Sequence, residues 1–222
     1  MADPDRVPGT AAVLRLLVGS RIRAQLSYRR SFVAELVGQL LFVAVDLVEL
    51  VAVLGSAPAV GGLRFRELFA VFAFAQVGFA LGSLVLGQFD QVGDRVRAGT
   101  VDVLLVRPMS PLLQVATDDI ALRRLGRLVA ALVVLPIGLS GVDVDWTPAR
   151  VLLAVATPLA GGVVFAALFV VSGSISFWLV DGREFGSAFT YGGNYLAQWP
   201  VGVLPTLLSR LFTFVLPAAF VG

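Results

Sequence analysis

The feature that most constrains this chain is a series of apolar runs, each roughly as long as a membrane is thick. A transmembrane helix needs about 20 mostly apolar residues, because it rises about 1.5 Å per residue through a hydrocarbon layer of about 30 Å. The runs lie at about residues 32–54, 67–87, 120–141, 149–180 and 185–203, and Pro148 is placed to begin the fourth. The sequence therefore predicts an all-α integral membrane protein with five transmembrane helices.

The overall composition is typical of an integral membrane protein. Of the 222 residues, 58% are hydrophobic and only 14% are charged, whereas soluble domains are about half apolar and about a quarter charged. The mean hydropathy is +0.90. This composition excludes a soluble globular domain, a disordered chain and a nucleic-acid-binding module, so the bilayer is the first expected partner.

Missing residue types narrow the chemistry further. The chain has no Cys and no His, and all 17 of its basic residues are Arg. Disulfides, thiolate catalysis, Ser-His hydrolysis and Cys- or His-ligated metals are therefore excluded. A P-loop needs a Lys on the phosphates, so this chain does not bind ATP in that way. We expect neither enzyme activity nor a cofactor or metal in this chain.

The arginines are unevenly distributed along the chain. With the N-terminus in the cytoplasm, 13 of them fall on the cytoplasmic side, before residue 32, within 88–127 and at Arg183. The outer side keeps the other four, which are Arg64, Arg66, Arg150 and Arg210. Cytoplasmic loops carry an excess of basic residues. The bias predicts a multi-pass protein of the cell inner or plasma membrane, with its N-terminus in the cytoplasm.

Residues 32–222 are expected to form one polytopic domain, preceded by residues 1–31, and both ends of the chain differ from the five spans. Residues 1–31 repeat apolar side chains every four positions opposite a basic face, which favours an amphipathic helix lying in the membrane interface. The alternative is a plain basic segment before the first span. Residues 206–222 are apolar but short, so they are expected to form an outer re-entrant helix or a short span.

One cytoplasmic stretch carries a family resemblance. RVRAGTVDVLLVRPMSP, residues 95–111, resembles the R-x-x-x-G-T-x-(D/E)-x-L-L-x-(R/T)-P-x-S segment of the membrane-spanning permeases of type-2 ABC exporters, the ABC-2 family transporter proteins. The matching residues are Gly99, Thr100, Asp102, Leu104, Leu105, Arg107, Pro108 and Ser110.

The resemblance implies a function for the whole chain. It implies a permease that forms a substrate path and works with a second permease, identical or related. The coupling loop 88–119 would hold a coupling helix that docks on a separate ATP-binding-cassette ATPase subunit, where ATP and Mg would bind. It also implies a sixth span and a basic tail, whereas this sequence stops at Val221–Gly222. The expected number of spans is therefore five, or six if the chain is incomplete.

Simple physical chemistry supports docking at this loop. Its apolar residues Val101, Leu104 and Leu105 would form an anchor that needs a partner surface to bury against. Charged residues would form a rim around that anchor. With the bend residue Gly99 and the stop residue Pro108, the full set expected to couple to the ATPase is Arg95, Arg97, Gly99, Thr100, Asp102, Leu104, Leu105, Arg107 and Pro108. The alternative is an ordinary loop between helices.

Polar residues inside the spans are candidates for the substrate path, since such residues usually face the bundle interior or a cavity. Asp46 and Glu49 are three residues apart and share a helix face. They are either part of the path or, as we favour, placed near headgroups or paired with an Arg of another helix. Asn194 and Tyr195 are further candidates, and Asn194 is suited to hydrogen bonding across helices.

Two other functions stay open from sequence alone. One is an integral-membrane lipid-modifying transferase with an acidic metal site, for which Asp118–Asp119 is the only trace and lacks a second acidic motif. The other is a non-catalytic membrane assembly factor. A neighbouring gene with a P-loop motif would favour the transporter.

Overall fold

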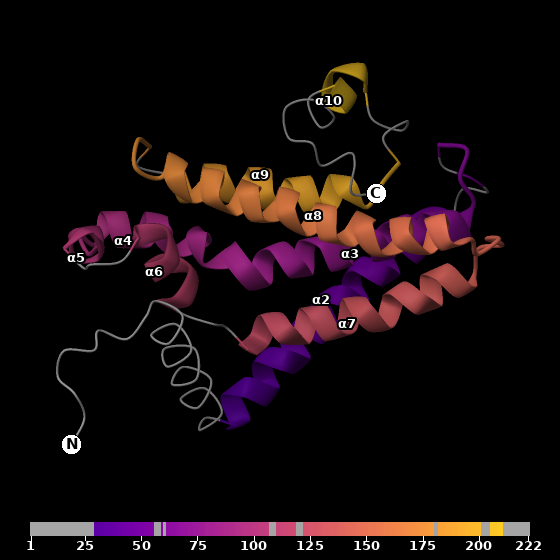
Figure 1. Ribbon diagram of the computed structural model, residues 1–222, viewed down its shortest axis with the longest axis horizontal. Coiled ribbons are helices and arrows are strands. Elements are labelled where there is room, and N and C mark those ends of the chain that lie inside the picture. The colour runs from indigo at the N-terminus through magenta and orange to yellow at the C-terminus, as the bar shows by residue number, and fades with distance from the viewer. Residues whose placement is uncertain are drawn as a thin grey trace.

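The computed structural model describes residues 29–55, 59, 61–106, 110–118, 122–179, 182–200 and 205–210. Within these ranges the chain is helical and contains no β-strand, which confirms the all-α prediction. The helices expected over 1–31 and 206–222 lie largely outside the described residues. The elements, drawn in Figure 1, are α2 (Arg29–Gly55), α3 (Phe65–Leu86), the 3-10 helix η1 (Gly87–Gln91), α4 (Val92–Arg97), α5 (Val101–Leu105), α6 (Pro111–Asp118), α7 (Leu122–Ser140), α8 (Pro148–Ile175), α9 (Gly182–Ala197) and α10 (Thr206–Arg210).

Helices α2, α3, α7, α8 and α9 lie in the five regions of the predicted spans. Among the described residues, two segments are long and apolar enough to cross a membrane, namely Phe65–Arg97, which joins α3, η1 and α4, and Pro148–Ile175, which is α8. α7 carries Arg124 and Arg127 near its start, and α9 has only 16 residues. The full count of spans stays a prediction.

The start of α8 follows directly from local sequence. Thr147 has extended backbone, and its hydroxyl oxygen accepts a hydrogen bond from the backbone N–H of Arg150 at 3.4 Å. Pro148 then begins the helix, where its fixed φ is suitable and its missing N–H costs nothing. The predicted helix start at Pro148 is confirmed.

α3 is the central helix of the bundle. It packs between α7 and α8, while α9 covers α8 and α2 crosses α7 (Figure 1). Three almost completely buried phenylalanine side chains fill the contact between α3 and α8: Phe79, Phe165 and Phe169. Phe72 is equally buried but packs on the other side of α3, in the cluster with α2 and α7. Phe79 meets the ring of Phe165 edge-on at 5.2 Å between centroids. These rings form the dry centre of the fold.

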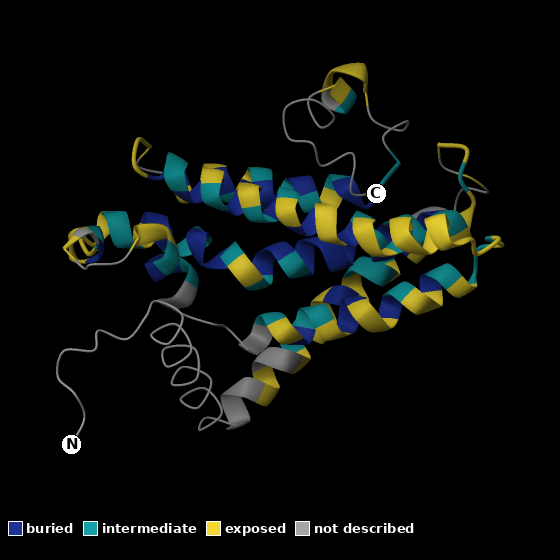
Figure 2. Ribbon diagram, in the orientation of Figure 1, coloured by how far each residue is buried: buried dark blue, intermediate teal, exposed yellow. Residues whose placement is uncertain are grey.

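The outer faces of the helices are apolar as well. Exposed residues follow the outer sides of α2, α7 and α8 (Figure 2). Large apolar side chains stay uncovered along these faces, for example Leu41 on α2, Ile137 on α7 and Leu152 on α8. Exposed apolar area of this extent is unusual for a soluble monomer. Lipid or another protein chain must therefore cover these faces.

Glycines bring the backbones of neighbouring helices together. A Cβ added at Gly82 of α3 would lie 2.7 Å from the Cβ of Phe165 and 2.8 Å from the backbone nitrogen of Ala166. A Cβ added at Gly138 of α7 would lie 3.3 Å from the Cβ of Ala73 and from backbone atoms of α3. Small residues at such contacts permit the close approach on which helix association in membranes depends.

We expect Gly82→Ala to destabilise the bundle, because the new methyl group meets backbone of α8 that has no room to move. Overpacking of this kind costs about 1–3 kcal/mol. The measurement is the thermal midpoint of the detergent-purified protein. Gly38→Ala on α2 is the matched control, since its Cβ meets nothing within 4 Å. Equal midpoints for the two variants would contradict the close packing of α3 and α8.

Candidate functional site

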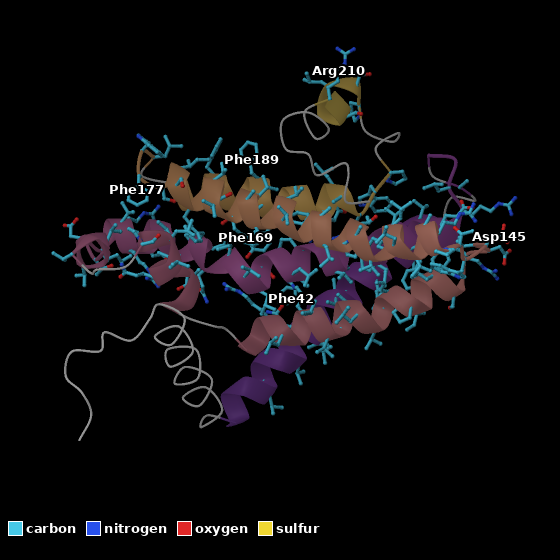
Figure 3. The ribbon with its side chains drawn as sticks, viewed as in Figure 1. Phe42, Asp145, Phe169, Phe177, Phe189 and Arg210 are labelled. Atoms are coloured by element: carbon cyan, nitrogen blue, oxygen red, sulfur yellow. The ribbon has the colours of Figure 1, made fainter. Side chains whose placement is uncertain are left out.

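The segment with the family resemblance lies at one end of the bundle, beyond the C-terminal end of α3. It is helical and consists of η1, α4, α5 and α6, which gather at the left of Figure 1. Asp145 lies in the connection at the opposite end of the bundle (Figure 3). The segment therefore stands at the end where α3 and α8 finish and α7 and α9 begin.

Gly99 turns the chain between α4 and α5. Its φ is +66°, in the left-handed region that favours glycine. The backbone N–H of Gly99 donates to the carbonyl of Val96 at 3.1 Å, and that of Thr100 donates to the carbonyl of Arg95 at 3.0 Å. This is the Schellman arrangement that ends many helices. The predicted bend at Gly99 is confirmed, and it explains the glycine by backbone conformation alone.

The structure corrects the expected position of Leu104. We expected its side chain to face outward as part of an anchor, but only 9% of it is exposed. It packs in the bundle's own core cluster, which includes Val92 and Val115. Its carbonyl accepts a hydrogen bond from Nε2 of the buried Gln114 at 2.8 Å. Outward-facing apolar side chains come instead from Val103, which is 52% exposed, and Val106, which is 83% exposed.

Other residues of the expected coupling set are only partly described. Arg107 and Pro108 lie outside the described residues, as does the side chain of Leu105. Thr100 and Asp102 are exposed on the segment. The hydroxyl of Thr100 donates to the backbone oxygen of Arg95 at 3.3 Å, which reinforces the turn at Gly99.

Two ion pairs join α4 to the start of α9. Arg183 donates to a carboxylate oxygen of Asp94 at 2.5 Å, and Arg97 lies 3.4 Å from a carboxylate oxygen of Glu184. All four side chains are partly exposed, so each pair contributes little stability by itself. The two pairs instead fix the position of α4 against the start of α9, which lies more than 80 residues later in the chain.

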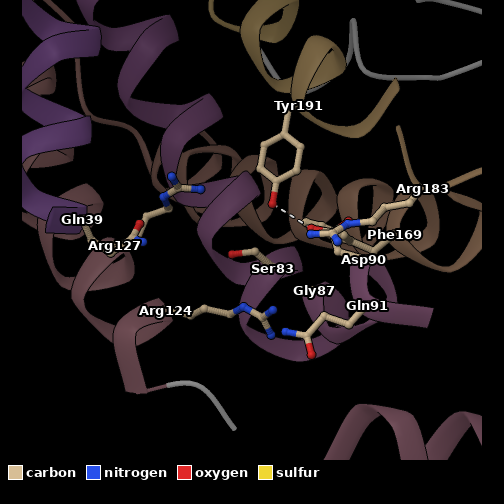
Figure 4. A pocket seen from close by; sticks show the side chains of 10 residues that line it. All are labelled: Gln39, Ser83, Gly87, Asp90, Gln91, Arg124, Arg127, Phe169, Arg183 and Tyr191. Carbon is tan, nitrogen blue, oxygen red and sulfur yellow. Dashed lines mark hydrogen bonds between the residues drawn. The ribbon is translucent and has the colours of Figure 1, made fainter. Parts of the chain in front are cut away.

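A polar pocket of about 220 Å³ opens beside this junction. Residues from five helices and η1 line it: Gln39, Ser83, Gly87, Asp90, Gln91, Arg124, Arg127, Phe169, Arg183 and Tyr191 (Figure 4). The Tyr191 hydroxyl donates to a carboxylate oxygen of Asp90 at 2.7 Å. The sequence did not predict this pocket, because its residues come from separated parts of the chain.

Arginines dominate the charge of this pocket. The guanidinium carbon of Arg127 lies 5.1 Å from the ring centroid of Phe79, a cation-π contact. Arg124 donates to the side-chain oxygen of Gln88 at 3.4 Å. Asp90 supplies the carboxylate among the lining residues.

The four candidate residues of the substrate path lie in three different environments. Asp46 accepts a hydrogen bond from Nε2 of Gln76 on α3 at 3.0 Å. Glu49 accepts a hydrogen bond from the Tyr195 hydroxyl, so the structure brings these two candidates together. The side-chain oxygen of Asn194 is buried and has no hydrogen-bond partner among the described residues. Gln76 was missed, although a lone amide in an apolar span is a visible signal.

The small polar face of α8 packs on α9. The Ser172 hydroxyl donates to the backbone oxygen of Gly186 at 2.9 Å and lies 2.7 Å from the Thr190 hydroxyl. A Cβ at Gly186 would lie 2.8 Å from the Cβ of Ser172. Ser172 therefore serves helix packing, with both hydroxyls satisfied inside the contact.

We expect Asp46→Leu to lower the thermal midpoint more than Asp46→Asn. Gln76 is 1% exposed, so loss of its acceptor leaves a buried amide unsatisfied at a cost of about 1–3 kcal/mol. In Asp46→Asn, the side-chain amide oxygen keeps an acceptor in place. Thermal unfolding of both purified variants measures the difference. If Asp46→Leu were as stable as Asp46→Asn, the hydrogen bond would have no structural role.

Comparison with known families places these features in context. The sequence model of one family, described as ABC-2 family transporter protein, matches residues 40–222. No curated protein and no solved structure matches the chain. The family match gives no support to the lipid-modifying transferase. Because the match covers most of this apolar, all-helical chain, the protein belongs to the ABC-2 family of transporter proteins, as a membrane permease that partners an ATPase subunit rather than hydrolysing ATP itself.

Proposed function

We propose that this chain is the permease of an exporter and that the segment from η1 to α6 docks on a separate cytoplasmic ATPase subunit. ATP and Mg²⁺ bind on that partner. Two permeases, identical or related, form the working unit, and the substrate path runs between them. The permease crosses the cell membrane through the five spans predicted between residues 32 and 203, with its N-terminus in the cytoplasm.

The observation that carries this proposal is the exposed apolar tip of the segment. Val103 and Val106 face outward at the end of the bundle, where arginine-rich sequence predicts the cytoplasm. The described core does not cover these valines, so an apolar partner surface is needed to bury them. Asp102 and Arg97 lie nearby in sequence and are also exposed. An apolar contact with a charged rim is the form of a protein-docking site.

Contacts of the segment with α8 and α9 would transmit a movement of the segment to these two helices. Leu104 is buried among the residues of the core cluster that also contains Phe165 and Phe169 of α8. The ion pair of Asp94 with Arg183 joins α4 to α9. A push on the segment is therefore delivered to α8 and α9 together, because both are held to it by direct contacts.

The proposed placement in a bilayer also has to agree with the length of α2 and with the arginines of α7. α2 has 27 residues, which gives a rise of about 40 Å, longer than the hydrocarbon core. The Arg124 and Arg127 side chains at the start of α7 point into the pocket at this end of the bundle, so their charges are not exposed to the hydrocarbon core. The exposed apolar face of α2, including Phe42 (Figure 3), gives a second permease or lipid a surface to cover.

We expect Val106→Asp to release the ATPase subunit during co-purification. The substitution puts a charge into an apolar contact, and burial of such a side chain is worth about 1.5–3 kcal/mol, or at least a tenfold change in affinity. The measurement is the ratio of ATPase to permease in the purified complex. Val144→Asp, in the connection at the other end of the bundle, is the matched control and should leave that ratio unchanged.

Retention of a coupled ATPase by the double variant Val103→Asp and Val106→Asp would exclude this tip as the docking site. Normal membrane insertion of both variants shows that any loss of ATPase arises from the contact itself.

We expect cysteines on the two ends of the bundle to label from opposite sides of the membrane. The chain has no native Cys, so Ala98→Cys and Val144→Cys each give a single reactive thiol. A membrane-impermeant maleimide should label the Ala98→Cys variant only in inside-out vesicles and the Val144→Cys variant only in intact cells. The reverse pattern would overturn the proposed orientation.

A further inference from the structure

The connection between α8 and α9 exposes large apolar side chains at the end of the bundle that carries the segment. Directly after Ser176, the C-cap of α8, come Phe177, Trp178 and Leu179, which we name the apolar turn. Trp178 is 80% exposed and Phe177 is 55% exposed. Phe177 can be seen at this end of the bundle in Figure 3. The described core does not cover the apolar turn, so it needs a surface from outside the chain.

The backbone N–H groups of the apolar turn are already hydrogen-bonded. The N–H of Phe177 donates to the carbonyl of Ser174 at 3.1 Å. The N–H groups of Trp178 and Leu179 both donate to the carbonyl of Ile175, at 3.0 and 3.1 Å. Unpaired backbone groups keep most irregular segments out of a membrane. This turn can enter the interfacial region of a bilayer without leaving these donors unpaired.

The charged residues of the same connection face α4. Arg183 donates to a carboxylate oxygen of Asp94 at 2.5 Å, and Glu184 lies 3.4 Å from Arg97. A Cβ added at Gly93 of α4 would lie 3.0 Å from the Cβ of Arg183, so protein fills this side of the connection. The connection therefore has a charged side that α4 occupies and an apolar turn that α4 leaves uncovered.

The length of α8 matches the full thickness of a bilayer. Its 28 residues give a rise of about 42 Å, and a bilayer with its headgroup regions is about 40–45 Å thick. An exposed tryptophan stands at each end of the helix, with Trp146 just before the N-cap Thr147 and Trp178 shortly after the C-cap. Tryptophans gather at the two membrane–water interfaces, because the indole ring has an apolar body and a polar N–H.

The apolar turn also continues the apolar outer face of α8. Val163 and Val171 on that face are exposed, and exposed residues follow the outer side of α8 in Figure 2. α8 is one of the described segments that are long and apolar enough to cross a membrane. Lipid that covers this face therefore reaches the apolar turn directly, which favours lipid over a second protein as its partner.

We propose that the apolar turn lies in the headgroup region of the leaflet at this end of the bundle, with the Trp178 ring at the membrane–water interface. Trp146 marks the opposite interface at the start of α8. The anchored turn also sets the height of α4 relative to the membrane, because the ion pair of Arg183 with Asp94 joins the two. The partner of this surface is the bilayer itself, so the inference does not rest on ATPase docking.

Tryptophan fluorescence of the full-length chain in phosphatidylcholine vesicles measures this depth. The chain has three Trp, so Trp146→Phe combined with Trp199→Phe leaves Trp178 alone. We expect lipid brominated near the headgroup end of its acyl chains to quench Trp178 more than lipid brominated near the chain ends. The matched variant, Trp178→Phe with Trp199→Phe, keeps Trp146 and should give the same order of quenching.

A second measurement keeps the test decisive if the Phe replacements prevent folding. The chain has no native Cys, so Trp178→Cys carries a single polarity-sensitive dye. Its emission should report an environment less polar than water. Ala98→Cys is the control, because Ala98 is exposed on the coupling segment and its dye should report water. Emission at position 178 as water-like as that at position 98 would contradict the proposal.

The quenching results distinguish lipid from the other possible surroundings. Strong quenching of Trp178 by iodide on both sides of the membrane, with none by either brominated lipid, places the turn in water and overturns the proposal. Absence of quenching by all three reagents means that protein covers the turn, and it excludes lipid as the partner. Stronger quenching by bromine near the chain ends places the turn in the hydrocarbon core and overturns the interfacial position.

Discussion

The close contact between α3 and α8 is the constraint on which the rest of this structure depends. Gly82 lets the two backbones approach, and Gly162 lies opposite the side chain of Leu81 in the same contact. With both helices at this distance, the phenylalanine rings of α3 and α8 interlock. In lipid, burial of apolar groups drives helix association little, so packing and cross-helix hydrogen bonds must supply it. α7 packs on α3, and α9 packs on α8.

Charged and polar side chains are distributed unevenly along the bundle. Acidic and basic groups meet at the end where α4 joins α9, and arginines of α7 line the pocket there. Farther along the helices, the polar groups are paired one by one, as Asp46 is with Gln76 and Glu49 is with Tyr195. Ion pairs thus add to core packing at one end of the permease, and the remainder is held mainly by close packing.

Local sequence predicted the helices well, but it did not predict which side chains meet. The glycine at 99 and the proline at 148 act on their own backbone, so their effects were readable from sequence. The burial of Leu104 depends on Val115 and on α8, and no local pattern encodes that contact. Gln76 and Arg127 were likewise missed as site residues, because their roles arise from α2, α3 and α7 lying together.

The burial of Leu104 has a consequence for how this protein is made. The core cluster that receives it contains Phe165 and Phe169 of α8 and Ala197 at the end of α9. Chains emerge from the ribosome N-terminal end first, so α5 is synthesised well before the residues that complete its binding place. The cluster that holds Leu104, next to the outward-facing Val103 and Val106, is complete only when α8 and α9 are present. A partner that recognises this face therefore selects finished permeases over partly synthesised ones.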